Sequence, residues 1–199
     1  DADKMIYAIT AVNGLNGKII VRKNGNDDEI MKTSEILLPG KHNLENVGAA
    51  VMASITAGVS LKNIIKVLKE FKGLEHRLEF VRSINGVKYY DDSFSTTPET
   101  AIAAIKSFKA PEILILGGSS KGSDFTELGN VIRKAKNIKV IIGIGKEWEK
   151  MKEQFRLENT GLVVIEGDKN MKEIILAASK VAEPGDIVLL SPACASFGL

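Results

Sequence analysis

The pattern of apolar and polar positions divides the chain into two parts near Gly73. Before that point, short apolar runs separated by Asn-Gly turns are followed by two stretches with apolar residues at helical spacing. After it, continuous apolar runs alternate with amphipathic stretches, which is typical of parallel strands covered by helices on both faces. We therefore predict an α/β chain of two parts, residues 1–72 and residues 73–199, the second being a Rossmann-like domain with a mostly parallel sheet.

The elements expected in the first part are strands, turns and two helices. The strands are predicted over residues 5–10, 18–21 and 35–38, with a turn over residues 24–28. The helices are predicted over residues 43–59 and 61–71, and small residues in the first of them indicate close packing.

The second part is expected to begin with a hairpin, residues 78–84 and 87–90, joined by Asn85-Gly86, a type I′ turn signal. Thr97 followed by proline is a helix start, because proline suits the first helical position. The predicted helices are residues 98–108, 125–135, 147–155 and 171–181. The predicted strands between them are residues 112–116, 139–144, 162–165 and 186–190.

Composition narrows the class of protein. The 199 residues are 44% hydrophobic and 26% charged, and a net charge of +2 is too small to indicate a nucleic acid or a membrane surface as partner. No apolar run approaches the roughly 18 residues of a membrane span. A single cysteine fits a reducing cytoplasm. We also expect a monomer without membrane insertion. A start at Asp1 and an end just past a loop indicate a piece of a longer protein.

Residues 191–197 (Ser-Pro-Ala-Cys-Ala-Ser-Phe) directly follow an apolar strand. The carboxyl end of a buried strand is where open α/β sheets bind ligands. Ser191 and Ser196 offer hydroxyls there, and the alanines allow a ligand to approach the backbone. Cys194 is interpreted as a small buried thiol, because both histidines that could activate a nucleophile lie far away in sequence. No His/Cys cluster has metal-ligand spacing, so no protein-only zinc site is expected.

Two further polar loops follow strands. Residues 91–97 place two acids and four hydroxyls at a helix start, where backbone N–H groups can hold an anion. One acid could hold a ribose and Thr96 could bind an anion, although ordinary capping by Thr97 is the alternative. Residues 117–125 lack the spacing of a phosphate loop, and we interpret them as placing the Lys121 ammonium where it meets an anion. The alternative is a solvated lysine in a glycine-rich turn.

Two shorter patterns could contact a nucleotide. Asn43 and Asn46 are three residues apart at a helix start, so their amides share one side and suit an adenine edge or a ribose. The alternative is capping by Asn43 with Asn46 exposed. Arg77 could pair with a phosphate and His76 could stack on a base, or both could belong to a linker with an ion pair to Glu75.

In their order along the chain, these loops resemble the Mur ligases of peptidoglycan synthesis, and among them those that add D-glutamate. The specific elements are Gly-Gly-x-x-Lys-Gly-x-Asp-Phe over residues 117–125 and Ser-Pro-Ala-Cys-Ala-Ser over residues 191–196. The resemblance covers the chain from Pro39 to its end, whereas residues 1–38 resemble the closing strands of the central ATPase domain only loosely.

The resemblance implies a three-domain, cytoplasmic, ATP-dependent and ADP-forming carboxylate-amine ligase. Residues 1–72 would be the C-terminal remnant of its ATP-binding domain, and residues 73–199 its glutamate-binding domain, truncated at the end. The carboxylate of UDP-N-acetylmuramoyl-L-alanine would become an acyl phosphate, which the amine of D-glutamate attacks. ATP and magnesium are the implied cofactors. The P-loop, a carbamylated lysine and the magnesium ligands would lie outside this chain, so we expect no ligase activity from the chain alone.

The family's nucleotide contacts carry over onto residues already singled out. The base would be contacted by Asn43 and Asn46, with His76 and Arg77 nearby, and the ribose would be held by Asp92. The two carboxylates of D-glutamate would be bound by Thr96, Lys121, Ser196 and the backbone of Phe197. Lys121 and Asp92 are the residues expected to contribute to catalysis. Phe94 stands where the family has a lysine, so contacts at that position are expected to differ.

Two other interpretations remain open at the level of sequence. One is a Mur-type ligase for a different amino acid, or a folylpolyglutamate synthase. The other is a stand-alone Rossmann-like binding module without catalysis, which the missing P-loop favours.

Overall fold

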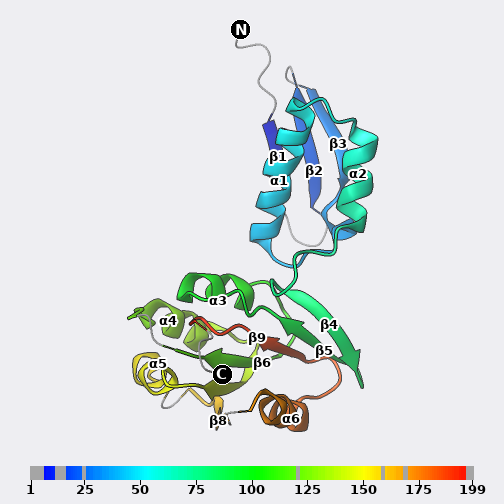
Figure 1. Cartoon of the computed structure of the whole chain (residues 1–199). Coiled ribbons are helices and arrows are strands. Elements are labelled where there is room, and N and C mark those ends of the chain that lie inside the picture. The colour runs from blue at the N-terminus through cyan, green and yellow to red at the C-terminus, as the bar shows by residue number, and fades with distance from the viewer. Residues whose placement is uncertain are drawn as a thin grey trace. The chain divides into compact units, whose positions relative to one another are not determined.

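The computed structural model describes residues 7–11, 17–23, 26–119, 122–157, 160–167 and 170–195. The chain forms two compact units, Asp1–Gly73 and Leu74–Leu199, so the boundary lies one residue after the predicted one. Figure 1 shows the elements of each unit. Among the described residues, no helix combines the length and the apolar character needed to cross a membrane.

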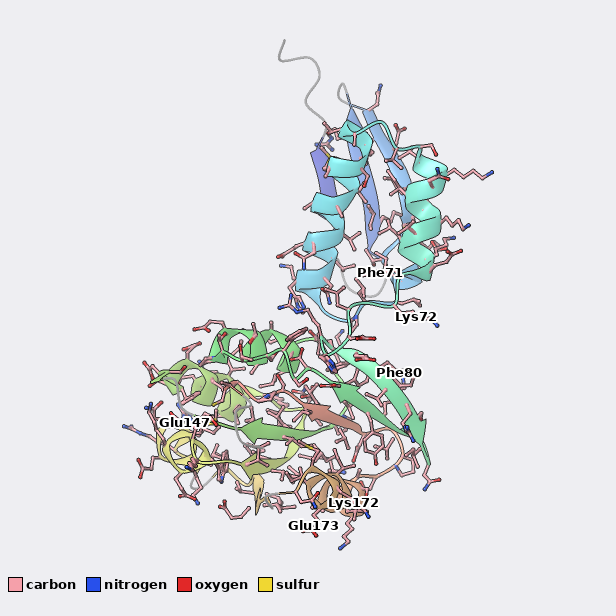
Figure 2. All side chains as sticks on the ribbon, in the orientation of Figure 1. Phe71, Lys72, Phe80, Glu147, Lys172 and Glu173 are labelled. Atoms are coloured by element: carbon pink, nitrogen blue, oxygen red, sulfur yellow. The ribbon has the colours of Figure 1, made fainter. Side chains whose placement is uncertain are left out.

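The first unit is a three-stranded antiparallel sheet with two helices. Its strands, in the order β1-β2-β3, are Tyr7–Ala11, Lys18–Lys23 and Asn26–Lys32. Helix α1 spans Lys41–Thr56, and α2 spans Leu61–Glu70 with Phe71 as its C-cap (Figure 2). The core of this unit consists of side chains from the sheet and both helices, among them Ile19, Val21, Met31, Val47, Val51 and Ile64.

Two predictions for this unit were wrong. Strand β3 begins inside the predicted turn. No strand forms over residues 35–38, because Glu35 ends the short 3-10 helix η3, Thr33–Glu35, and residues 36–38 have no regular secondary structure. The acidic first half of β3 has the composition of a turn, and only Ile30 and Met31 are buried. Exposed cross-strand ion pairs hold that half, with Arg22 Nε 2.5 Å from Asp27 Oδ1.

The second unit is a six-stranded sheet in the order β4-β5-β9-β6-β7-β8. Strand β4 is antiparallel to β5 and the other pairs are parallel, which confirms the predicted mostly parallel sheet. The strands are β4 Glu79–Ile84, β5 Val87–Asp91, β6 Glu112–Gly117, β7 Ile138–Ile144, β8 Val163–Glu166 and β9 Ile187–Leu190. The helices are α3 Pro98–Ile105, α4 Thr126–Lys134, α5 Trp148–Phe155 and α6 Met171–Val181. The turn between β4 and β5 has positive φ at Asn85 (50°) and Gly86 (80°), as the predicted type I′ turn requires.

Alternate side chains of the central strands enter two separate cores. On one face, Leu114 and Leu116 of β6 pack with residues of α3, α4 and α5. On the other face, Ile113 and Ile115 of the same strand pack with Ile174 and Ala178 of α6. Figure 1 shows this arrangement of helices about the sheet. Burial on both faces explains why these strands are continuously apolar in sequence.

The position of β9 creates the site. Although β9 is the last strand along the described chain, it lies between β5 and β6 and runs parallel to both. The carboxyl ends of these three strands therefore meet at one edge of the sheet, and bring residues 91–97, 117–119 and 191–195 together.

Candidate functional site

Asp92 lies at the centre of this edge. It follows β5, it is 3% exposed, and its own N–H donates to the Leu190 carbonyl of β9 (2.8 Å). Its Oδ2 accepts bonds from the hydroxyls of Ser191 (2.8 Å) and Ser95, and its Oδ1 accepts the Leu78 N–H (3.1 Å). Burial raises the pKa of Asp92, and these bonds oppose that effect. One carboxylate thus joins three segments that are far apart in sequence.

These bonds bear on the predicted roles of Asp92 in ribose binding and catalysis. Both of its oxygens already serve donors inside the protein, so a ribose hydroxyl would share them. The bond to Leu78 also supports a turn in which His76 (φ 62°) and Leu78 (φ 45°) both adopt left-handed backbone conformations, which are uncommon outside glycine. Organising this turn is the role that the structure shows for Asp92. The contacts to ribose and the role in catalysis stay predictions.

Beside Asp92, the neighbouring acid forms an exposed cluster that the sequence did not reveal. Asp91 Oδ2 lies 2.8 Å from His76 Nδ1, and Asp91 Oδ1 accepts the Ser93 N–H (2.8 Å). The bond to Asp91 raises the pKa of His76. Partial burial would raise the pKa of Asp91, but the bonds from His76 and Ser93 lower it overall. The pair therefore favours a protonated imidazole at the surface.

Phe94 adds an aromatic face to this cluster. Its ring meets the His76 ring edge-on, with centroids 5.9 Å apart, and its N–H donates to the His76 carbonyl (3.0 Å). The Phe94 side chain is 58% exposed, so the corner presents an aromatic surface next to a cation. The structure thus gives Phe94 a contact with His76. Arg77, which follows His76 in the sequence, is also exposed.

The ligand atoms of His76, Glu79 and Asp91 lie within 4.8 Å of one another, close enough to hold a metal ion. Spacing in the sequence gave no sign of this group. Each member already has a protein partner, because Nδ1 of His76 bonds Asp91 and the Glu79 carboxylate accepts the backbone N–H of His76 (2.8 Å). The arrangement is therefore satisfied without an ion.

Thr96 is the predicted anion ligand at this edge, and it takes no part in capping helix α3. Thr97 and Thr100 cap α3, because the Thr97 N–H donates to the Thr100 hydroxyl (3.3 Å). Pro98 takes the first helical position. Ser95 is used by Asp92. Within the described residues, the half-buried Thr96 hydroxyl has no hydrogen-bond partner, so it is available to a ligand.

The glycine-rich loop and the loop after β9 are bonded to each other. The Gly117 N–H donates to the Pro192 carbonyl (2.9 Å) and the Ser119 N–H donates to the Ala195 carbonyl (2.8 Å). A Cβ atom on Gly118 would lie 2.5 Å from the Ala195 oxygen, so this approach depends on glycine. The predicted glutamate ligands Lys121, Ser196 and Phe197 lie outside the described residues. Their roles stay predictions.

Asn43 and Asn46 belong to the first unit. The Asn43 amide donates to the Pro39 carbonyl (2.7 Å), with 9% of the residue exposed, and Asn46 is exposed. Gly40 is the N-cap of α1, so Asn43 is not the cap that the alternative supposed. Instead, the Asn43 amide joins the first turn of the helix to the preceding chain. The contact of Asn43 and Asn46 with a base stays a prediction.

Cys194 is confirmed as a buried thiol. It is 4% exposed, and burial, together with the charge of Glu147, raises its pKa to about 12. A thiol with this pKa is almost entirely protonated at neutral pH, which argues against a nucleophilic role.

The sequence is similar to those of several proteins named as ligases. A family model described as "Mur ligase, glutamate ligase domain" matches residues 76–194, more than half of the chain. A UDP-N-acetylmuramoylalanine--D-glutamate ligase of Pelotomaculum thermopropionicum is 42% identical over 183 residues, covering 92% of this chain and 39% of the relative. The protein of the same name in Caldicellulosiruptor bescii is 40% identical over 184 residues, with the same coverage. The chain thus spans about two fifths of the length of these relatives.

Solved structures share the fold at lower identity. MurF from Acinetobacter baumannii superposes with a TM-score of 0.67 at 19% identity, covering 93% of this chain and 40% of that one. A folylpolyglutamate synthase from Thermotoga maritima gives a TM-score of 0.59 at 19% identity, covering 90% and 41%. These likenesses establish the fold, which confirms the predicted fold class, and carry nothing about substrate.

Proposed function

The chain belongs to the Mur ligase family, and we propose that it is the D-glutamate-binding part of an ATP-dependent, ADP-forming ligase. The complete enzyme would join D-glutamate to UDP-N-acetylmuramoyl-L-alanine in peptidoglycan synthesis. Identity of about two fifths to relatives of that name supports this choice within the family. Because the chain spans only part of their length, the reaction belongs to the whole protein, which we propose to be a cytoplasmic monomer.

The chemistry requires an activated carboxylate and a correctly placed amine. When bound, ATP with magnesium supplies the phosphoryl group that converts the substrate carboxylate to an acyl phosphate. The residues of this chain hold D-glutamate so that its amine meets the activated carbon, and amide formation releases phosphate and a proton. Holding the two reactants in place replaces an encounter in solution, which can account for a large part of the rate enhancement.

A dicarboxylate needs a cation and several N–H or O–H donors. The observation that carries the proposal is the meeting of residues 91–97, 117–119 and 191–195 at one sheet edge, with the Thr96 hydroxyl available. Lys121, Ser196 and the backbone of Phe197 would complete the donors for the two carboxylates, and Lys121 would supply the cation. The start of α3 adds a favourable dipole for an anion.

The exposed corner of the second unit has the chemistry of a nucleotide contact. His76 offers a ring whose pKa is raised by Asp91, Phe94 offers an aromatic surface, and Arg77 offers a guanidinium that can pair with phosphate. We propose that these residues lie near the base, with Asn43 and Asn46 contacting it and Asp92 reaching the ribose. His76, Glu79 and Asp91 are already satisfied by bonds within the protein, and we propose that the magnesium ligands lie in the rest of the protein.

Binding of D-glutamate to the purified chain tests the proposal. We expect D-glutamate to shift amide resonances of residues 91–97 in an NMR titration, and L-glutamate and diaminopimelate to bind more weakly. Thr96→Val removes one hydroxyl donor and should raise the dissociation constant about tenfold, while Thr56→Val in the first unit should not change it. Equal or preferential binding of L-glutamate would favour the folylpolyglutamate alternative, and no binding of D-glutamate would refute the proposal.

We further propose that the chain alone forms no amide bond, because its described residues include no triphosphate cradle. Incubation with D-glutamate, UDP-N-acetylmuramoyl-L-alanine, ATP and magnesium should yield no product, and detection of the amide would contradict this.

A further inference from the structure

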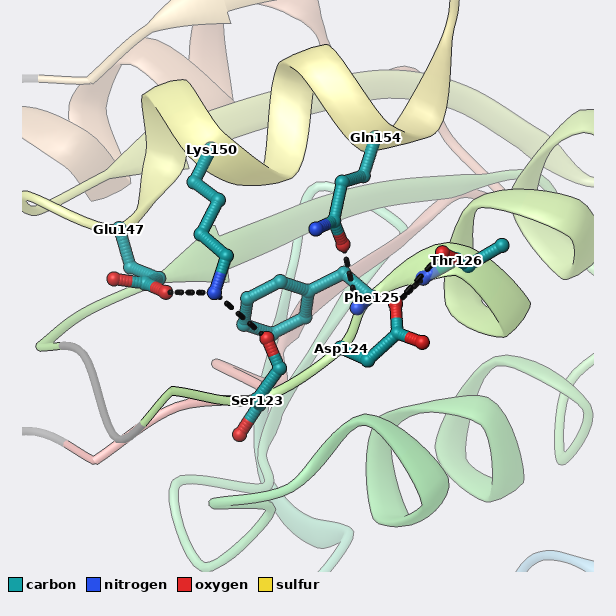
Figure 3. A network of polar contacts seen from close by, with 7 residues as sticks. All are labelled: Ser123, Asp124, Phe125, Thr126, Glu147, Lys150 and Gln154. Carbon is teal, nitrogen blue, oxygen red and sulfur yellow. Dashed lines mark hydrogen bonds and ion pairs between the residues drawn. The ribbon is translucent and has the colours of Figure 1, made fainter.

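Helix α5 contacts the glycine-rich loop through residues that have no assigned role. Figure 3 shows Lys150 reaching down from this helix, where its Nζ donates to the Ser123 carbonyl (2.8 Å). The same nitrogen lies 3.2 Å from Glu147 Oε1 and 5.5 Å from the centroid of the Phe125 ring. Glu147 lies at the start of α5 (Figure 2) and is 5% exposed.

Three bonds attach α5 to both ends of this loop. Before Lys121, the Glu147 N–H donates to the Gly118 carbonyl (3.1 Å). After Lys121, Lys150 bonds Ser123 and the Gln154 side chain accepts the Phe125 N–H (2.7 Å). Gly118, on one side of Lys121 in the sequence, and Ser123 and Phe125, on the other, are therefore all bonded to α5 or its N-cap.

The pair of Glu147 and Lys150 also lies within electrostatic reach of the loop after β9. The charge of Glu147 raises the pKa of the Cys194 thiol and the charge of Lys150 lowers it. A carboxylate as buried as that of Glu147 is costly unless a cation and hydrogen bonds compensate it. Lys150 supplies that cation, so the burial of Glu147 favours keeping the ion pair formed.

We propose that Lys150 is a positioning residue for binding of the amino-acid dicarboxylate. By fixing the Ser123 carbonyl against α5, it orders residues 122–125 of the glycine-rich loop in advance, so that the ligand has less ordering to impose on them. Preorganisation of this kind improves affinity without any contact between the positioning residue and the ligand. The inference rests on the proposed function, because the ligand is taken to be D-glutamate.

Three variants of the chain separate positioning from loss of charge. Lys150→Met keeps an apolar side chain beside Phe125 but removes the ammonium, and Lys150→Arg keeps a cationic donor. Lys152→Met is the matched control, because Lys152 lies on the same helix, has the same 40% exposed side chain and also bonds two partners, Glu149 and Glu166. Dissociation constants for D-glutamate would be measured by calorimetry, and amide hydrogen exchange over residues 117–125 by NMR.

We expect Lys150→Met to weaken D-glutamate binding about tenfold and to speed exchange at the Phe125 amide. Lys150→Arg should restore most of the affinity, and Lys152→Met should match the wild-type chain in both measurements. Wild-type affinity in the Lys150→Met variant would overturn the inference, as would equal losses in Lys150→Met and Lys152→Met. If Lys150→Met fails to fold, Glu147→Gln replaces it, and unchanged affinity in a folded Glu147→Gln chain would overturn the inference as well.

Failure of the proposed function gives a different result. If the wild-type chain does not bind D-glutamate, the proposed function and the ligand-binding half of this inference are both refuted. The exchange measurement still decides the other half, because faster exchange over the loop in Lys150→Met alone would show ordering by Lys150, and unchanged exchange would refute it.

Discussion

Glu112 makes the stability of the second unit depend on pH. This residue begins β6 with no exposed surface, and the Asn137 amide donates to its Oε1 (2.8 Å). Its other oxygen, Oε2, has no hydrogen-bond partner within the described residues. Burial raises the pKa of Glu112 from 4.5 to about 8, so the folded protein keeps this carboxyl protonated at neutral pH.

The sign and size of the effect follow from linkage. The folded state binds the proton more tightly than the unfolded state, so the stabilising effect is complete below pH 4.5 and is lost as pH rises through 8. Between pH 5.5 and pH 8.5 these two pKa values correspond to a loss of about 3 kcal/mol. Glu112→Gln has no proton to lose, so its stability relative to wild type should rise by about that amount over the same interval.

Urea unfolding followed by tryptophan fluorescence measures this directly. Trp148 is the only tryptophan of the chain, it is 2% exposed and it lies in the same unit as Glu112. Any fixed cost of placing an amide at Oε2 is the same at both pH values and cancels in the comparison. Glu149→Gln, at a side chain that is 70% exposed, is the control and should show no such trend. A Glu112→Gln curve that stays parallel to wild type across pH would refute the reasoning.

Two further predictions concern the edge of the sheet. Gly118→Ala places a Cβ atom 2.5 Å from the Ala195 oxygen, so the two loops should separate, with a loss of roughly 1–3 kcal/mol in urea unfolding and weaker D-glutamate binding; unchanged stability would contradict the observed packing. Asp91→Asn removes the anion that raises the pKa of His76, so an NMR titration should find a lower His76 pKa in the variant. An unchanged His76 pKa would show that the ion pair does not form in solution.

The sequence predicted the elements of the second unit well because its signals there are local. Alternate burial on two faces makes β6 and β7 continuously apolar, and Asn85-Gly86 and Thr97-Pro98 are specific turn and helix-start signals. In the first unit the same reasoning missed β3, because ion pairs with another strand, which the local composition does not show, stabilise its acidic half.

The site was predicted in part, since its loops follow strands but their partners are distant in sequence. The anion-binding role of Thr96 stays a prediction, although the structure assigns the capping of α3 to Thr97 and Thr100. The internal bonds of Asp92 to Ser191 and of Asp91 to His76 join residues 99 and 15 positions apart, and nothing in the spacing indicates them. Lys150 has an ordinary helical sequence around it, and only the fold places it against the glycine-rich loop.

The central position of β9 has a consequence for how the second unit folds. During synthesis, β5 and β6 emerge long before β9, and each has an unpaired edge until residues 187–190 arrive between them. Contacts between such distant segments form slowly, because the intervening chain must first be brought together. The β4–β5 hairpin should therefore dock late, and a nascent chain interrupted before Ile187 would expose two aggregation-prone strand edges. The bond between Ser191 and Asp92, which joins two loops at the sheet edge, would then form only after β9 has entered the sheet.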